Sequence, residues 1–415
     1  MTVVKNYLPI LIFLTLLLAC SLSTPEPTAT PVPTQTPAPP SATAPPTATP
    51  TPTEPPPTPT HTATPSKTPT PAPTATPTMP AYPGRIVFTG FAEGSIDLFV
   101  ADVADHSVER LTDNDEEASV FPLWSPDGTK IAYLSFNFEE GQVGVGLVDL
   151  ASDGAISLIV RDIGTASFNL SWAQDNRYLL YNGPQPNGGG NDVYRLDSTN
   201  GTLTNLTANS PNWDAFPKYS PAAGLIAFVS DRADNGQGSD NIWVMNANGG
   251  ALSNLTPNDE YFWEDTHPGW SPDGAQIAFF RSGLFSSASD PGGPAGLWRV
   301  DVQSGEESLI IPLDEAFFGA EPIWSPDGTR IAYQIREPDA GAIWIVEVAT
   351  GDTIRVAAFP GDNFYTSWSP DSQAIVFTNE NDDLIRIYIA AADGSGLWPL
   401  FPKAGNGYAH WSPQP

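Results

Sequence analysis

Hydrophobic residues between positions 84 and 415 form short apolar runs that repeat in a fixed order along the chain. One run is a triplet made of an apolar residue, a second apolar and often small residue, and an aromatic residue. It occurs seven times, at intervals of 44 to 54 residues, over positions 86–88, 131–133, 179–181, 226–228, 277–279, 331–333 and 375–377. Short continuous apolar runs of this kind predict strands that are buried on both faces.

Each triplet belongs to a longer unit of four predicted strands. An aromatic anchor precedes the six later triplets, at Trp124, Trp172, Tyr219, Trp270, Trp324 and Trp368. A second apolar strand follows the triplet, as at positions 241–247, and a short outer strand follows that, as at 110–112 or 205–207. Four-stranded units at this period predict a β-propeller.

The two ends of the repeat array complete each other. The triplet that begins at Ile86 has no anchor before it, and the anchor Trp411 has no triplet after it. We therefore expect the strand that carries Trp411 to be the innermost strand of the first blade. The predicted fold class is all-β: a seven-bladed β-propeller of four-stranded blades, closed by the C-terminal strand, which completes the first blade.

A pentad, Trp-Ser-Pro-Asp-Gly, links anchor to triplet at 124–128, 270–274 and 324–328. Its Asp could be read as a repeated catalytic or metal-binding acid. Pro at the second position of a turn and Gly at the fourth instead predict a tight hairpin turn. The variants keep this chemistry, because Asn176 stands where Gly is expected and Asn also tolerates a left-handed backbone. We therefore assign the Asp to the turn and the Trp anchors to the core between blades.

The pentad and the triplet after it resemble the WD-like repeat of TolB-type propellers over the whole of 84–415. The same repeat builds the propellers of dipeptidyl-peptidase-type enzymes and of oligogalacturonate lyases. The resemblance implies the architecture and not an activity, since one fold carries many functions. TolB propellers usually have six blades, so the count predicted here departs from the family.

The first 83 residues have a different character. Residues 1–19 combine Lys5 with a short apolar run, as in a secretory signal peptide, and Cys20 follows them directly in the stretch Leu17-Leu18-Ala19-Cys20. This ending resembles the bacterial lipobox, which implies that Cys20 carries lipid and that lipid is the only membrane attachment. Residues 20–83, the lipidated Cys and a Pro/Thr-rich segment, predict a disordered stalk. Whether the stalk is O-glycosylated or a plain tether is left open.

Composition narrows the choice of ligand. The chain has a formal charge of −30, one Cys and four His. This charge argues against nucleic acid and favours cationic ligands, divalent ions or basic partners. One Cys excludes an intrachain disulfide, and so few His argue against a multi-histidine metal centre.

Candidate chemistry lies in the segments that lead into each anchor, here called the approach segments, which are rich in acidic and aromatic residues. The position three before each anchor holds Phe121, Asn169, Phe216, His267, Glu321, Tyr365 and Tyr408, and ring symmetry should bring these residues to one channel mouth. The residues predicted to bind ligand are Trp213, Asp214, Tyr261, Trp263, Glu264, Asp265, His267, Glu321, Tyr365, Tyr408 and His410. Aromatic rings with scattered carboxylates suit a cationic, peptide or carbohydrate ligand. The alternative is that these rings only pack between blades.

Two functions remain open. The first is a cell-envelope lipoprotein, monomeric and on the extracytoplasmic side, whose propeller binds a protein, peptide or glycan without chemistry. The second is a carbohydrate-active enzyme, a lyase or hydrolase, that uses carboxylates with His267 or Tyr365. No cofactor is predicted. Positions 231–241 resemble a calcium loop only superficially, but a calcium site with oxygen ligands is left open. A metal site made of His267, His410 and an acid such as Glu321 is also left open.

Overall fold

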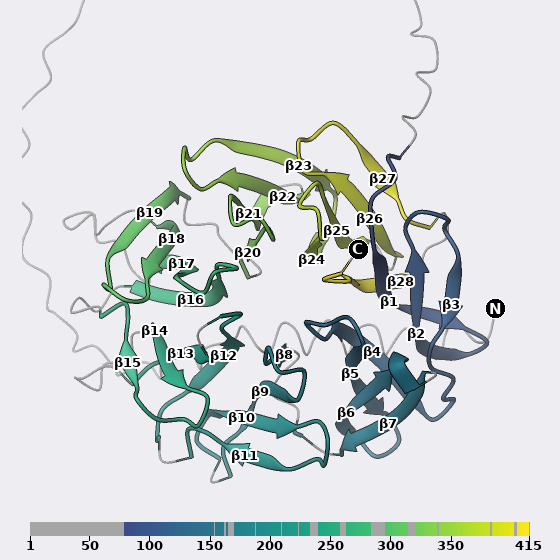
Figure 1. Cartoon of the computed structure of the whole chain (residues 1–415), viewed down its shortest axis with the longest axis horizontal. Helices are drawn as coiled ribbons and strands as arrows, with labels where there is room; N and C mark the ends of the chain where they lie inside the picture. The colour runs from purple at the N-terminus through teal and green to yellow at the C-terminus, as the bar shows by residue number, and fades with distance from the viewer. Residues whose placement is uncertain are drawn as a thin grey trace, which may run out of the picture.

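The computed structural model describes residues 79–414 except 153, 162, 165–169, 187, 209, 223, 233–239, 258–262, 284–294, 314–320, 338–339, 382–383 and 402–404. In this part of the chain, strands form seven antiparallel sheets of four strands each. The sheets stand in a ring, with one strand of each sheet facing the centre (Figure 1). The predicted seven-bladed propeller is thus confirmed.

The blades are numbered here along the chain, and their strands are given from the innermost outward. Blade 1 has β28 (Asn406–Trp411), β1 (Arg85–Ala92), β2 (Ser95–Asp102) and β3 (Val108–Arg110). Blade 2 has β4 (Glu117–Trp124), β5 (Lys130–Asn137), β6 (Gln142–Asp149) and β7 (Ala155–Val160), with the 3-10 turn η1 (Leu150–Ser152) before β7. Blade 3 has β8 (Ser171–Trp172), β9 (Tyr178–Pro184), β10 (Asn191–Asp197) and β11 (Leu203–Asn205).

The remaining blades repeat the order. Blade 4 has β12 (Asp214–Tyr219), β13 (Leu225–Ser230), β14 (Asn241–Asn246) and β15 (Ser253–Asn254). Blade 5 has β16 (Trp263–Trp270), β17 (Gln276–Gly283), β18 (Gly296–Asp301) and β19 (Glu307–Pro312). Blade 6 has β20 (Ile323–Trp324), β21 (Arg330–Glu337), β22 (Ala340–Glu347) and β23 (Thr353–Phe359). Blade 7 has β24 (Asp362–Trp368), β25 (Ala374–Asn381), β26 (Leu384–Ala391) and β27 (Leu397–Pro399).

The ring closes as the sequence predicts. β28, the last strand, pairs antiparallel with β1, and Ile86 lies opposite Trp411. Trp411 is 1% exposed, and its indole N–H donates to the carbonyl of Pro83 at 2.9 Å. The two ends of the propeller are therefore held together by a complete four-stranded blade.

The triplets form the second strand of each blade and supply the core. None of their residues is more than 5% exposed. The core lies between blades, since one cluster joins Val87 and Leu98 of blade 1 with Trp124 and Ile131 of blade 2. Apolar surface removed from water contributes ~25 cal/mol per Å², so the contacts between blades hold the ring together.

The outer strands end earlier than predicted. The sequence indicates strands at 110–112 and 205–207, whereas β3 and β11 end at Arg110 and Asn205. Two residues after each strand end, a threonine hydroxyl provides the next hydrogen-bond acceptor. Thr112 Oγ1 accepts the N–H of Leu98 at 2.9 Å, and Thr207 Oγ1 accepts the N–H of Val193 at 3.0 Å. A side chain thus replaces the backbone at the end of the ladder.

The pentads are turns, as predicted. Gly128 N–H donates to the Ser125 carbonyl, and Gly128 has a φ of 70°. Asp127 accepts the Ser125 hydroxyl at 2.7 Å and the Thr129 N–H at 3.0 Å, so its carboxylate is occupied within its own loop. Burial opposes the charge, but these hydrogen bonds hold the pKa of Asp127 below its usual value. Asn176 and Ser372, which replace the Gly, also have positive φ, at 57° and 60°.

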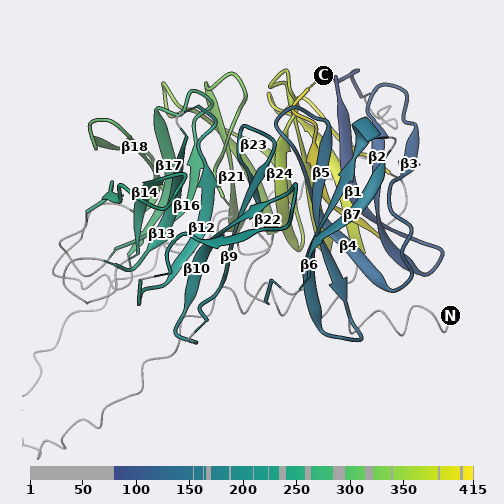
Figure 2. The same cartoon turned by 60° about the horizontal axis from the view of Figure 1, so that its bottom comes forward.

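The strands run between two faces of the ring (Figure 2). The pentad turns lie on one face, here called the pentad face. The chain approaches each inner strand from the other side, here called the approach face. Residues 79–84 lie at the pentad face, because they precede Arg85, which pairs with Asp102 at that end of blade 1. The C terminus lies at the same face.

Candidate ligand channel

The inner strands are irregular at the position three before the anchor. The pairing of β4, β12, β16, β24 and β28 with the second strand of their blade shifts register at or beside this position. Phe121, Phe216, His267 and Tyr408 occupy it with φ values of 54°, 50°, 56° and 53°. A left-handed backbone costs a non-glycine residue about 1–2 kcal/mol. Four large side chains therefore share one strained conformation at one repeat position.

These side chains contact one another across blade boundaries. The rings of Phe121 and Tyr408 have centroids 4.4 Å apart, and Phe364 of blade 7 lies 5.9 Å from Tyr408. On the other side, Phe216 lies 4.3 Å from His267. Figure 1 shows the inner strands around the centre of the ring, so these contacts form two aromatic groups on inner strands. Phe121 and Tyr408 are 6% and 8% exposed and belong to the hydrophobic core that blades 1, 2 and 3 share.

An ion pair connects two inner segments that are not neighbours. Lys218 Nζ of blade 4 lies 2.5 Å from Glu321 Oε2, just before β20 of blade 6. Their side chains are 19% and 29% exposed. Blade 5 lies between them, so the pair spans its inner strand near Gly269. A Cβ at Gly269 would lie 2.1 Å from the Pro322 carbonyl oxygen, so only glycine lets blade 6 come so close.

Two histidines share this region. Burial, and to a lesser degree the charge of Lys218, lower the pKa of His267 to about 4 and that of His410 to about 4. Both imidazoles are therefore neutral at pH 7. The Nδ1 atom of His410 is buried and has no hydrogen-bond partner among the described residues.

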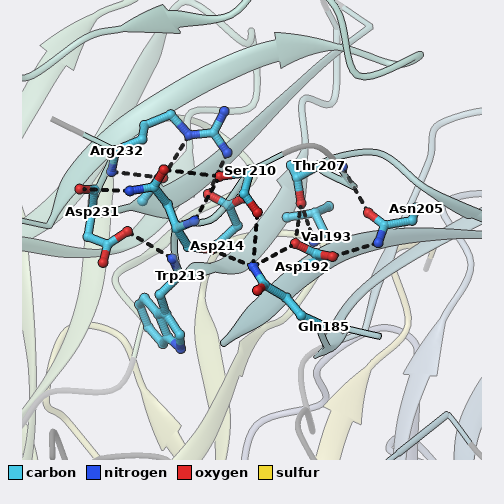
Figure 3. A network of polar contacts seen from close by, with 12 residues as sticks. Gln185, Asp192, Val193, Asn205, Thr207, Ser210, Trp213, Asp214, Asp231 and Arg232 are labelled. Atoms are coloured by element: carbon cyan, nitrogen blue, oxygen red, sulfur yellow. Dashed lines mark hydrogen bonds and ion pairs between the residues drawn. The ribbon is translucent and has the colours of Figure 1, made fainter. Parts of the chain in front are cut away.

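Trp213 is held at the start of β12 by a polar network (Figure 3). Gln185 Nε2 donates to the carbonyl of Asn212 at 2.7 Å and to Asp192 Oδ1 at 3.1 Å. The Trp213 N–H donates to Asp231 Oδ1 at 2.8 Å. The backbone of Trp213 is thus fixed on both sides, and its ring makes a T-shaped contact with Phe216 at 5.9 Å.

Two of the predicted ligand-binding acids are occupied by the protein's own cations. Asp214 and Asp265 are both 0% exposed. Asp214 pairs with Arg232 at 2.5 Å, and Asp265 accepts two hydrogen bonds from Arg281 at 2.7 Å. Taking either partner out of a buried ion pair would leave the other charge uncompensated, so these two carboxylates stay with their arginines and are not available to a ligand.

A further group of acids lies at the approach face of blades 4 and 5. Burial, then the charges of Glu264, Asp231 and Asp265, raise the pKa of Asp240 to about 7. Burial also raises the pKa of Glu264. Within the described residues, no group of three or more His, Cys, Asp or Glu side chains could hold a metal ion. The loop 233–239 lies outside those residues, so the calcium hypothesis stays a prediction.

The other predicted residues divide into three groups. His267, Glu321, Tyr408 and His410 lie on inner segments around the channel. Tyr261, like Asn169, lies outside the described residues, and the side chains of Trp263 and Tyr365 are not described.

Lys218 and Phe364 were not predicted. Lys218 could have been found, because it is the single Lys or Arg in the approach segment 212–219, and the corresponding segments contain neither at 113–124, 258–270, 314–324, 361–368 and 405–411.

Comparison with known sequences gives one family. The TolB beta propeller domain family matches residues 76–285 and 314–414. The chain is 26% identical over 263 residues to an uncharacterized protein of Agrobacterium fabrum, which covers 59% of this chain and 80% of that protein. It is 37% identical over 90 residues to the Tol-Pal system protein TolB of Rhizorhabdus wittichii, which covers 21% of this chain and 17% of that protein.

Comparison with solved structures gives the same fold. An oligogalacturonate lyase in complex with manganese matches with a TM-score of 0.58 and 16% identity, over 74% of this chain and 86% of that one. At this identity the likeness concerns the fold alone. No helix among the described residues is long and apolar enough to cross a membrane.

Proposed function

The chain belongs to the TolB beta propeller domain family, and from this premise we propose that it is a binding module of the cell envelope. Its central channel takes a protein, peptide or glycan ligand without chemical conversion. The ligand contacts the aromatic groups around Phe121, Phe216 and Tyr408 and the polar side chains His267 and His410, beside Glu321.

One observation carries the proposal. Phe121, Phe216, His267 and Tyr408 lie at one repeat position and all have positive φ. Strained backbone of this kind persists where the surrounding structure imposes it, and it clusters at ligand clamps and active sites. The strain fixes four rings around a channel, and rigid rings recognise ligands with little loss of conformational entropy.

The envelope location rests on the first 83 residues. We propose that Cys20 carries lipid and that residues 21–83 connect it to the propeller on the extracytoplasmic side. The name of the Rhizorhabdus relative places that protein in the Tol-Pal system, which supports a protein partner for this chain. Since residues 79–84 lie at the pentad face, we place the partner at the opposite, approach face.

A capture experiment tests the binding role. The full chain, immobilised through its C terminus, is exposed to envelope extract and to a glycan array. Phe216→Ala and His267→Ala should each weaken capture at least about tenfold, since buried aromatic anchors carry much of an interface's affinity. Lys130→Met on the pentad face is the matched control. Equal capture by all four proteins would exclude the channel as the site.

The same material separates binding from catalysis. If the chain is a lyase or hydrolase, a polysaccharide panel will yield unsaturated or shortened products with the wild type. Such products, lost in His267→Ala, would replace the binding proposal with the enzymatic alternative.

A further inference from the structure

Lys218 is the one permanent cation at its level of the ring. It stands directly before the anchor Tyr219. The other six blades carry Leu123, Ser171, Gly269, Ile323, Ser367 and His410 at this position. None of these is a Lys or Arg, and burial keeps the His410 imidazole neutral at pH 7. Lys218 therefore carries the single ammonium group at this repeat position, and Glu321 is its ion-pair partner.

The partner of Lys218 is held in place by a close approach of blades. Glu321 belongs to blade 6, and its neighbour Pro322 approaches the backbone of Gly269 in blade 5 too closely for any side chain there. This approach brings Glu321 over blade 5 to Lys218 at 2.5 Å. A partly buried ammonium without a partner is costly, so Glu321 satisfies Lys218 in the free protein.

One buried ring nitrogen near Lys218 has no hydrogen-bond partner among the described residues. His410 Nδ1 is buried and unpaired among the described residues, and the charge of Lys218 contributes to the low pKa of this ring. A neutral imidazole can donate one N–H, and Lys218 can donate three. Glu321 is 29% exposed, so its carboxylate can turn toward solvent and leave these donors to another acceptor.

We propose that Lys218 is the recognition point for an oxyanion of the ligand, a carboxylate or a phosphate group, and that Glu321 occupies its place in the free protein. This inference rests on the proposed function and names the ligand's chemistry at that same channel. The exchange of the Glu321 carboxylate for a ligand carboxylate leaves the charge beside Lys218 unchanged. The Phe216–His267 pair is on the neighbouring blades 4 and 5, so the part of the ligand next to the oxyanion is a ring or an apolar group.

Chemical rescue tests the proposal. Glu321→Ala removes the internal carboxylate and leaves space beside Lys218. The melting temperature of the full chain is titrated with acetate and with inorganic phosphate, against chloride at equal ionic strength. A bound anion stabilises only the folded state, so binding raises the melting temperature. The dissociation constant of acetate or phosphate should be at least about tenfold lower for Glu321→Ala than for wild type, because in wild type Glu321 occupies the place beside Lys218.

Two variants make the test specific. Lys218→Met combined with Glu321→Ala should lose the effect, whereas Lys130→Met combined with Glu321→Ala should keep it. Rescue by acetate supports a carboxylate ligand, and rescue by phosphate alone supports a phosphoryl group. No rescue in Glu321→Ala, or equal rescue in the double variant without Lys218, overturns the proposal.

The capture experiment separates this inference from the proposed function. If Lys218→Met captures the partner as well as wild type while Phe216→Ala does not, the oxyanion site is wrong and the binding channel stands. If capture fails for every protein and rescue still occurs, the oxyanion site stands and the partner-binding role is wrong. Circular dichroism establishes beforehand that Lys218→Met is folded.

Discussion

At the residue scale, four large side chains hold a backbone conformation that glycine adopts without strain. Phe121, Phe216, His267 and Tyr408 have φ between 50° and 56°. A register shift lies at or beside each of them, so a bulge and the strain occur together. Bulges re-aim a side chain. The positive φ therefore lowers the stability of the backbone at these residues, and the bulge sets the direction in which their rings point.

The strain can be measured at Phe216 by comparing Gly with Ala. At a strand position with negative φ, a Gly variant is less stable than the Ala variant by roughly 0.5–1 kcal/mol. At positive φ the order reverses, so Phe216→Gly should be more stable than Phe216→Ala by about 1 kcal/mol. Urea unfolding gives both values. The same pair at Leu123 should show the ordinary order, and an ordinary order at Phe216 would contradict the left-handed conformation.

The pH dependence of stability follows from His267. Its ordinary pKa is 6.5, and burial, then Lys218, lower the pKa in the folded state to about 4. Between these values the unfolded chain binds a proton that the folded chain does not, so this residue makes stability fall as pH falls from 6.5 to 4. His267→Gln lacks this contribution. Its free energy of unfolding should therefore decline less than that of wild type between pH 7 and 4.5.

An exposed histidine supplies the control for the pH experiment. His106 lies in the turn between β2 and β3 and is exposed. His106→Gln should follow the wild-type profile over the same range in urea unfolding. A His267→Gln profile parallel to wild type would show that this imidazole is protonated equally in both states.

At the element scale, the anchor tryptophans do more than fill space between blades. Within the described residues, five of them donate the indole N–H to the inner strand of the preceding blade, at 2.9–3.3 Å. In each case the acceptor is the carbonyl of the residue directly before that blade's anchor. Trp324, for example, donates to Gly269. These bonds set the rotation of one blade against the next.

Replacing an anchor by Phe separates packing from hydrogen bonding. Trp324→Phe removes the donor to Gly269 and leaves a buried carbonyl unpaired, which should destabilise the protein by about 2 kcal/mol or more. Tyr219 has a buried hydroxyl with no partner among the described residues. Tyr219→Phe should therefore change stability by less than about 1 kcal/mol. Equal losses in denaturant unfolding would show that the indole bonds contribute nothing.

The sequence predicted the elements better than the contacts between them. Pro and Gly in the pentad mark a turn wherever they occur, and Asn176 and Ser372 could be aligned with Gly because the pattern around them is intact. Nothing in the sequence marks positive φ at Phe216 or Tyr408, because the bulge depends on how the inner strand meets its neighbour. The Lys218–Glu321 ion pair was not predicted for a related reason. It joins blades 4 and 6, and such a contact requires the geometry of the closed ring.

At the scale of the whole molecule, the first described residues and the approach segments lie at opposite faces of the ring. Tyr82 packs against Trp398 and Trp411, with ring centroids 6.3 and 6.1 Å away, and so fixes the start of the propeller at the pentad face. The strained rings lie on inner strands reached from the approach face. The proposed tether would therefore join the propeller at the face opposite to the approach face.

This arrangement depends on closure by the last strand, which deletion of residues 408–415 tests. The deletion removes Trp411, whose burial alone is worth roughly 3–5 kcal/mol, and exposes the edge of β1 to other chains. We expect a lower melting temperature and association at higher protein concentration, measured by calorimetry and light scattering. Deletion of 413–415 alone keeps the β1–β28 pairing and should change little. If the longer deletion melts like wild type and stays monomeric, the seventh interface does not hold the ring, and the channel must keep its shape through the other six.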